Sequence, residues 1–156
     1  MVNRILLFVT FLFLVSCSNR GYEVSTAKGD SFINEPGRYY LKKGRLIVRE
    51  FEDGTLVYGV ADKFNRVQHQ QSIFSPFSDH QYWIIYLDTD ENVWFYCADL
   101  QQLEVVRYSQ DKKAYVYEKI EVDTVLPKAF EKNLNERGVD RNDILTIIEM
   151  RKFEAK

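Results

Sequence analysis

The 156-residue sequence is poor in the residues on which chemical sites are usually built, with only two cysteines and two histidines. Seven glycines and three prolines are too few for a collagen-like or low-complexity chain. A basic surplus is also missing, since 21 lysines and arginines stand against 23 acidic residues; we therefore expect no nucleic-acid partner. The chain is 46% hydrophobic and 15% aromatic, which excludes disorder, and its length suits one domain.

One long apolar run is present, over residues 5–15, with only Thr10 as a polar interruption and Arg4 before it. As a helix, the run would be roughly 16 Å long, at about 1.5 Å per residue. The hydrocarbon core of a bilayer is about 30 Å thick, so the run is too short to span it. A basic start followed by a short apolar run is typical of a secretory signal peptide, which we expect over residues 1–16.

The four residues that end this region are Leu14-Val15-Ser16-Cys17. They resemble the lipobox of bacterial lipoproteins: an aliphatic residue, a tolerant position, a small residue and a cysteine. The resemblance implies that the Cys17 thiol receives a diacylglycerol, that the chain is cut just before Cys17, and that the new amino terminus is acylated with a fatty chain such as palmitate. Two or more such chains anchor a protein stably. The implied partner is therefore a membrane; secretion without lipid, with cleavage near Ser16, is the alternative.

Ser18 bears on the location. In Gram-negative lipoproteins, an aspartate at this position resembles an inner-membrane retention signal, whereas serine resembles the default that is sorted to the outer membrane. We therefore expect a lipid-anchored protein outside the cytoplasm, on the periplasmic face of the outer membrane if the cell is Gram-negative. Residues 1–16 contain one charged side chain, Arg4, so their removal changes the formal net charge to 20 − 23 = −3. Cys97 is then the single free thiol, and no internal disulfide is expected.

The remaining chain divides at residue 38. Residues 18–37 are polar and lack a sustained period, which predicts a flexible tether. Residues 38–156 are predicted to form a single α+β domain. Its class is an antiparallel β-meander of about six or seven strands, with C-terminal helices packed on one face.

Turn-forming residues and the alternation of apolar and polar side chains predict the individual strands. Asp53-Gly54 predicts a two-residue hairpin turn that pairs Phe51 with Leu56 and Ile47 with Val60, so that Ile47 faces the core. Residues 81–88 and 92–98 are apolar on both faces, as in central strands that are covered on two sides. Further strands are expected at 66–73, 103–108 and 114–122. In the last strand, Ala114, Val116, Ile120 and Val122 are predicted to face inward and Tyr115, Tyr117, Lys119 and Glu121 outward.

A helical period begins near Pro127, which suits a first helical turn. Leu126, Phe130 and Leu134 follow at i, i+4 and i+8, and Gly138 is a C-terminal stop. Residues 144–153 favour a second helix, although their isoleucines would also suit a strand.

A weak calcium candidate is present in Asp88, Asp90 and Asn92, with Asp99 at the twelfth position of the loop. The glycine of the EF-hand pattern is replaced by Val93, and the flanking segments are strands. A polar hairpin turn is therefore the preferred interpretation, and we expect no resident metal or cofactor.

The histidines suggest little catalysis. His80 shares a loop with Ser75, Ser78 and Asp79, but a triad is defined by its geometry in space rather than by adjacency in a loop. Cys97, a possible nucleophile beside His69 or His80, lies in the middle of a strand, where a buried structural thiol is expected. The sequence therefore predicts a protein that is not an enzyme, and an envelope hydrolase that uses the His80 loop is the less favoured hypothesis.

Tyrosines provide the binding hypothesis. Tyr82 and Tyr86 share one strand face, and Tyr115 and Tyr117 share another. Tyrosine is enriched at protein interfaces, where the ring is buried and the hydroxyl stays wet. We therefore predict a lipid-anchored envelope protein whose β domain binds another protein as an accessory, inhibitor or immunity-type module. A structural subunit of an envelope assembly is the alternative.

Overall fold

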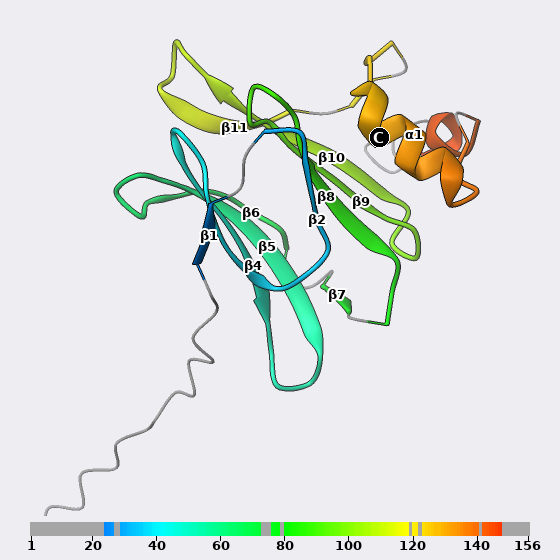
Figure 1. Ribbon diagram of the computed structural model, residues 1–156, viewed down its shortest axis with the longest axis horizontal. Coiled ribbons are helices and arrows are strands. Elements are labelled where there is room, and N and C mark those ends of the chain that lie inside the picture. Colours follow the sequence, from blue (N-terminus) through cyan, green and yellow to red (C-terminus); the bar gives the residue numbers. More distant parts are fainter. Residues whose placement is uncertain are drawn as a thin grey trace, which may run out of the picture.

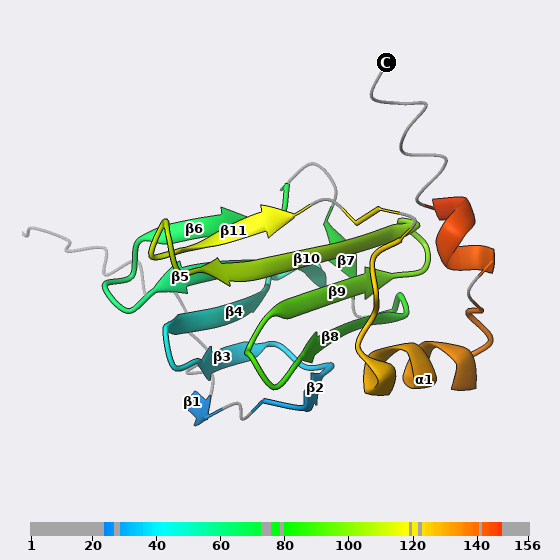
Figure 2. The same cartoon turned by 90° about the horizontal axis from the view of Figure 1, so that it is seen from above.

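The protein folds into three layers, in which two β-sheets lie face to face and helices cover the outer side of one of them (Figures 1 and 2). The computed structural model describes residues 24–26, 29–72, 76–78, 80–118, 120–121, 123–140 and 142–147. Within these ranges the chain forms eleven strands and helix α1 (Lys128–Glu136), and residues 142–147 are also helical. No helix in this part of the chain is long and apolar enough to cross a membrane.

Sheet A has the strand order β1-β3-β4-β5-β6, and the short strand β7 also pairs with β5. Its strands are β1 (Val24–Thr26), β3 (Gly37–Tyr40), β4 (Gly44–Glu50), β5 (Thr55–Asp62), β6 (Val67–Gln70) and β7 (Phe77–Ser78). Neighbouring strands are antiparallel except for β1, which runs parallel to β3 at the edge.

Sheet B has the order β11-β10-β9-β8-β2, with all neighbours antiparallel. Its strands are β2 (Ser31–Ile33), β8 (Trp83–Leu87), β9 (Val93–Cys97), β10 (Gln102–Ser109) and β11 (Ala114–Glu118). Figure 2 shows the two sheets overlaid in the same order, with β1 and β2 at one side and β6 beside β11 at the other. We call the line where β6 meets β11 the seam.

Sheet B is the middle layer, and both of its faces are buried. Successive residues of a strand point to opposite faces. In β8, Ile85 and Leu87 accordingly pack toward sheet A, whereas Ile84 and Tyr86 pack toward the helices. All five residues of β8 and all five of β9 are buried. This confirms the prediction that residues 81–88 and 92–98 contain central strands covered on two sides.

The helices cover sheet B through a few large apolar side chains. Phe130 and Leu134 of α1, together with Ile144 from the segment 142–147, pack against the outer face of sheet B. Pro127 precedes the first turn of α1, and Gly138, with φ of 81°, ends the helix. The α+β class with C-terminal helices on one face is thus confirmed; residues 148–153 of the second predicted helix lie outside the described residues.

Two predictions about organisation are wrong. The strands form two stacked sheets rather than one meander of six or seven strands. The expected tether is also too long, because β1, β2 and the start of β3 lie within residues 24–37. These are strands of three or four residues, too short to show a period of two, and their pairing rests on backbone hydrogen bonds that leave no side-chain signature.

The turn at Asp53-Gly54 forms, but the loop that joins the two strands is one residue longer than the predicted two. The Phe51 N–H donates to the carbonyl of Thr55 at 2.8 Å, and Gly54 has φ of 78°. One Asp53 carboxylate oxygen accepts hydrogen bonds from the Thr55 N–H at 3.0 Å and the Thr55 hydroxyl at 2.6 Å. A left-handed glycine after a turn is typical of a bulged hairpin loop rather than a two-residue turn.

The added residue changes which side chains of β4 face the core. Val48 pairs with Tyr58, and Ile47 pairs with Gly59. A slip of one residue moves every side chain of a strand to the opposite face. Ile47, predicted to be inside, therefore lies on the outer face of sheet A, and Val48 takes its place in the core.

Candidate functional site

The first pair of predicted binding tyrosines faces the protein's own helices. The Tyr86 ring stacks on Phe130 with centroids 5.8 Å apart, and its hydroxyl donates to Asp30 at 2.5 Å. The Tyr82 hydroxyl lies 3.3 Å from the side-chain oxygen of Asn133. The prediction that this face binds a partner is therefore wrong for Tyr86, which is 3% exposed, because α1 covers it.

The second pair points inward rather than outward. Tyr115 pairs with Tyr108, and Tyr117 pairs with Val106. Since Val106 faces sheet A, both tyrosines of β11 share that side, and Val116 faces away. Tyr115 is 3% exposed, and burial together with the charge of a nearby glutamate raises the pKa of its hydroxyl. Its predicted exposure is wrong.

Tyr117 differs from the other three because it lies at the seam, where β11 contacts β6. Its ring is 41% exposed and stacks on His69 of β6, with centroids 5.5 Å apart and planes 12° apart. Burial of one ring face and exposure of the other is the amphipathic situation that makes tyrosine effective at interfaces.

More exposed apolar surface lies along the same seam. Phe64, in the turn before β6, is 66% exposed, and Val67 is 63% exposed. Seven large hydrophobic side chains are exposed among the described residues, and three of them, Phe64, Val67 and Tyr117, belong to β6, the turn before it and β11. A bulge in the pairing of β5 with β6 places Val67 opposite Ala61, on the outer face of sheet A, and His69 opposite Val60, on the core side. We call Phe64, Val67, His69 and Tyr117 the seam patch. Phe64 was not among the predicted binding residues, although an aromatic residue in an otherwise polar turn is a visible signal.

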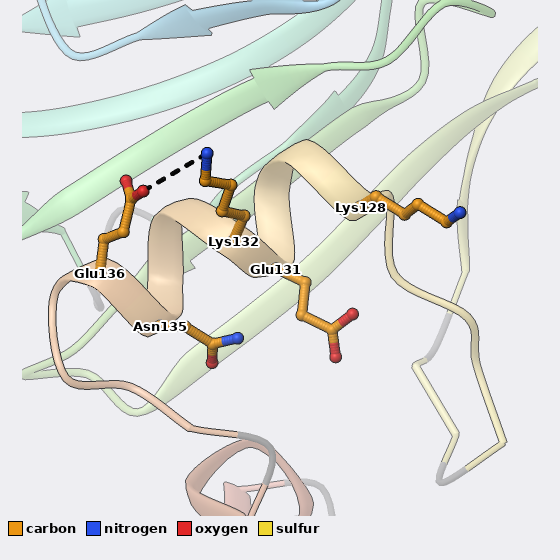
Figure 3. A pocket seen from close by; sticks show the side chains of 5 residues that line it. All are labelled: Lys128, Glu131, Lys132, Asn135 and Glu136. Carbon is orange, nitrogen blue, oxygen red and sulfur yellow. Dashed lines mark ion pairs between the residues drawn. The ribbon is translucent and has the colours of Figure 1, made fainter.

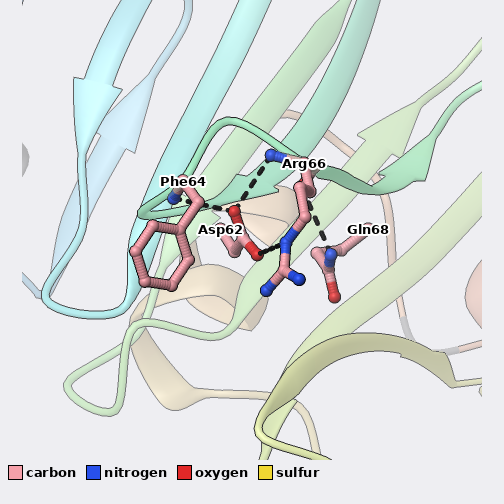
Figure 4. A network of polar contacts seen from close by, with 4 residues as sticks. All are labelled: Asp62, Phe64, Arg66 and Gln68. Carbon is pink, nitrogen blue, oxygen red and sulfur yellow. Dashed lines mark hydrogen bonds and ion pairs between the residues drawn. The ribbon is translucent and has the colours of Figure 1, made fainter.

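The turn that carries Phe64 is held by Asp62 (Figure 4). One Asp62 oxygen accepts the backbone N–H groups of Phe64 and Arg66 at 2.8 and 2.9 Å, and the other accepts Arg66 Nε at 2.7 Å. Burial opposes ionisation of Asp62, but the hydrogen bonds and charge of Arg66 prevail and lower the pKa of this carboxyl. The cations of Lys63 and Arg66 lie 5.1 and 5.4 Å from the Phe64 ring centre.

A buried polar cluster lies behind the seam patch, between the two sheets. The Glu104 carboxylate accepts hydrogen bonds from the Tyr58 hydroxyl at 2.7 Å and from the Gln102 side-chain amide at 2.5 Å. The Gln71 amide donates to Gln102 at 3.4 Å. Glu104 is 8% exposed, so these donors replace the water that the carboxylate loses on burial.

His69 joins this cluster by electrostatics rather than by a hydrogen bond. Its Nε2 lies 4.0 Å from a Glu104 oxygen, beyond hydrogen-bond distance. Burial lowers the pKa of His69, and the charge of Glu104 offsets part of that effect. The neutral imidazole is therefore favoured in the folded state, where it serves as a flat surface for Tyr117.

Of the calcium candidates, Asp88 and Asn92 are in contact, but Asp99 does not join them. The Asp88 carboxylate accepts four hydrogen bonds from its own hairpin, at 2.8–3.0 Å. The donors are the backbone N–H groups of Asp90 and Asn92, the Asn92 side-chain amide and the Trp94 indole N–H. Asp99 follows the far end of β9, five residues of strand away from this turn. Within the described ranges, no group of three or more metal-binding side chains is present.

The residues of the hydrolase hypothesis are only partly described. Ser75 and Asp79 lie outside the described residues. The Ser78 N–H donates to the Gln81 side chain, and His80 is exposed. Cys97 points into the core between the sheets with no exposed surface, and burial raises the pKa of its thiol, which disfavours the nucleophilic thiolate.

The outer face of α1 is polar. Figure 3 shows Lys128, Glu131, Lys132, Asn135 and Glu136 around a shallow depression of about 510 Å³. Lys132 and Glu136 form an ion pair at 3.7 Å. All five side chains come from one helix, which is what a solvated helix surface presents, and no apolar wall encloses a ligand.

Comparisons with protein families, curated proteins and solved structures find no match to this chain. Residue roles are therefore assigned from geometry. The seam patch is the candidate functional site, because it combines exposed aromatic rings with a rigid, hydrogen-bonded support. Cys17, the predicted lipidation site, lies outside the described residues.

Asp88→Asn is expected to destabilise the fold by about 2–4 kcal/mol, because an amide N–H₂ would face N–H donors that now bind a carboxylate. The measurement is the free energy of unfolding in urea. Asp90→Asn is the matched control in the same turn, and a change within about 0.5 kcal/mol is expected for this exposed side chain. Equal losses for the two variants would contradict the assigned role of Asp88.

The lowered pKa of His69 predicts a pH dependence of stability. The unfolded chain, with a histidine pKa near 6.5, binds this proton more tightly than the folded protein does. The stabilising contribution is therefore complete above pH 6.5 and is lost as the pH falls through the lower, folded pKa. In His69→Gln, the free energy of unfolding in urea should vary less with pH across this window than it does in the parent chain. An unchanged slope in His69→Gln would refute the assignment.

Proposed function

We propose that this chain is a lipid-anchored cell-envelope protein whose β domain binds another envelope protein through the seam patch. The anchor rests on the lipobox resemblance that ends at Cys17. The binding role rests on one observation above all: three of the seven exposed large hydrophobic side chains, Phe64, Val67 and Tyr117, belong to the two strands that meet at the seam and to the turn before β6. An accessory, inhibitor or immunity-type module would present such a surface.

The chemistry of the patch supports recognition of a protein. Aromatic residues and arginine contribute most of the binding energy at typical protein interfaces. Here, Phe64 is flanked by Lys63 and Arg66, and Tyr117 already stacks on His69. Side chains held in place before binding lose little conformational entropy when a partner arrives.

The position of the patch supports the same function. Sheet A begins at β1, which six residues separate from Cys17, and the seam lies at the opposite edge of the sandwich (Figure 2). A partner that approaches the seam would therefore meet the side of the domain remote from the anchored edge.

The anchor is tested by Cys17→Ala, with Cys97→Ala as the matched control. We expect Cys17→Ala to abolish the mass added by the lipid and to move the protein from the membrane fraction to the soluble fraction. Cys97→Ala should retain both. Intact-mass spectrometry and fractionation of the native host give the readout, and an unmodified Cys17 in the parent chain would contradict the anchor.

The binding surface is tested by Phe64→Ser combined with Tyr117→Ser. Loss of two hot-spot rings is expected to reduce cross-linking to the envelope partner at least about tenfold. Val125→Ser, which changes an apolar side chain that is 82% exposed in the segment between β11 and α1, should leave cross-linking unchanged. The same cross-linked proteins in the same yield from all three chains would exclude the seam patch as the binding surface.

A further inference from the structure

The outer face of sheet A is exposed or half-buried along β3 and β4, whereas Val57 and Ala61 of β5, on the same face, are buried. Core residues of β4 and β5 such as Leu46, Val48 and Tyr58 point toward sheet B, so the alternate residues point away from it. Figures 1 and 2 show the helices on the far side of sheet B, where they do not reach this face. The outward positions of β3, β4 and β5 are Arg38, Tyr40, Arg45, Ile47, Arg49, Thr55, Val57, Gly59 and Ala61.

These positions include three arginines and no acidic residue, although the protein as a whole is acidic. We call Arg38, Tyr40, Arg45, Ile47 and Arg49 the arginine face. None of its guanidinium groups forms an ion pair with another described residue. An unpaired positive field in a protein of net negative charge is available for an anionic partner.

Apolar and aromatic groups are interleaved with these cations. Arg45 lies over the Tyr40 ring at 5.4 Å, and Arg49 lies over the Phe51 ring at 4.9 Å. Tyr40 is 46% exposed and Ile47 is half-buried. Arginine binds phosphate through a planar fork of N–H donors, and tyrosine is enriched at the membrane–water interface.

The implied anchor keeps this face close to a membrane. Six residues separate Cys17 from Val24, the first residue of β1. The seven Cα–Cα steps from Cys17 to Val24 span at most about 25 Å, at up to about 3.6 Å per residue. Because β1 pairs with β3, the chain enters the fold beside Arg38 and Tyr40.

We propose that the arginine face docks on the anionic phosphate headgroups of the leaflet that holds the lipid anchor, and so sets the orientation of the domain. The inference rests on the proposed lipid anchor. Each arginine near an anionic leaflet contributes about a fivefold preference, which is about 1 kcal/mol. Three arginines together favour this orientation roughly a hundredfold, because the anchor has already brought the face to the surface.

The outer face of α1, on the opposite side of the molecule, has no such excess of positive charge. The outer face of α1 carries Lys128 and Lys132 together with Glu131 and Glu136, so positive and negative charges alternate there (Figure 3). Docking through the arginine face directs the helix layer away from the membrane (Figures 1 and 2).

The test uses the full lipidated chain, reconstituted into vesicles of phosphatidylcholine alone or of phosphatidylcholine mixed with phosphatidylglycerol. A fluorophore is placed at Tyr40→Cys on the arginine face or at Asn135→Cys on α1, in each case with Cys97→Ala to remove the buried thiol. Nitroxide-labelled headgroups in the vesicles quench a fluorophore that lies at the surface.

In anionic vesicles, we expect quenching at position 40 to exceed quenching at position 135 at least threefold, and in neutral vesicles the two should be similar. The triple change R38Q/R45Q/R49Q should abolish the difference. High salt should also abolish the difference in quenching in the protein that keeps all three arginines. This measurement does not depend on how the triple variant folds. Flotation with the vesicles is measured in every sample.

Each outcome decides one point. A chain that does not float lacks the anchor, and the proposed function fails with it. A chain that floats but shows equal quenching at both positions in anionic vesicles overturns the docking alone. Shielding of position 40 only after addition of an acidic protein likewise overturns it and assigns the face to a protein partner.

Discussion

The apolar character of both faces of β8 and β9 is the constraint on which the rest of the structure depends. Ile85 and Phe95 need cover on one side, and Ile84 and Trp94 need cover on the other. Burying one such side chain contributes about 1.5–3 kcal/mol, so neither face can remain in water. Sheet A and the helices supply the two covers. This order of layers makes sheet A an outer layer, and its far side carries the arginine face.

Features set by local chemistry or by strong periodicity were predictable from the sequence. The buried central strands, the α1 pattern of Phe130 and Leu134, and the stop at Gly138 each carry their own signal within a few residues. The pairing of strands into two stacked sheets was not predictable, because it depends on contacts between segments far apart in the chain. The short strands β1 and β2 carry no periodic signal of their own.

The candidate sites were harder to predict because a side chain's face depends on strand register and on the neighbouring layer. One extra residue in the loop at Gly54 moved Ile47 from the expected core to the outer face. In β11, tyrosines and valine alternate, and either set is apolar enough for a core; pairing with β10 decides that Tyr115 is buried. The contact of His69 with Tyr117 exists only because the two sheets meet at the seam.

In this order of layers, sheet B is enclosed and the outer side of β3 and β4 in sheet A is at least partly exposed. Hydroxyl-radical footprinting of the anchored protein in neutral vesicles measures this arrangement residue by residue through side-chain oxidation. The account predicts rapid oxidation of Tyr40 and Tyr117, and strong protection of Tyr86, Trp94 and Tyr115. Oxidation of Tyr86 and Tyr115 as fast as that of Tyr40 would contradict it.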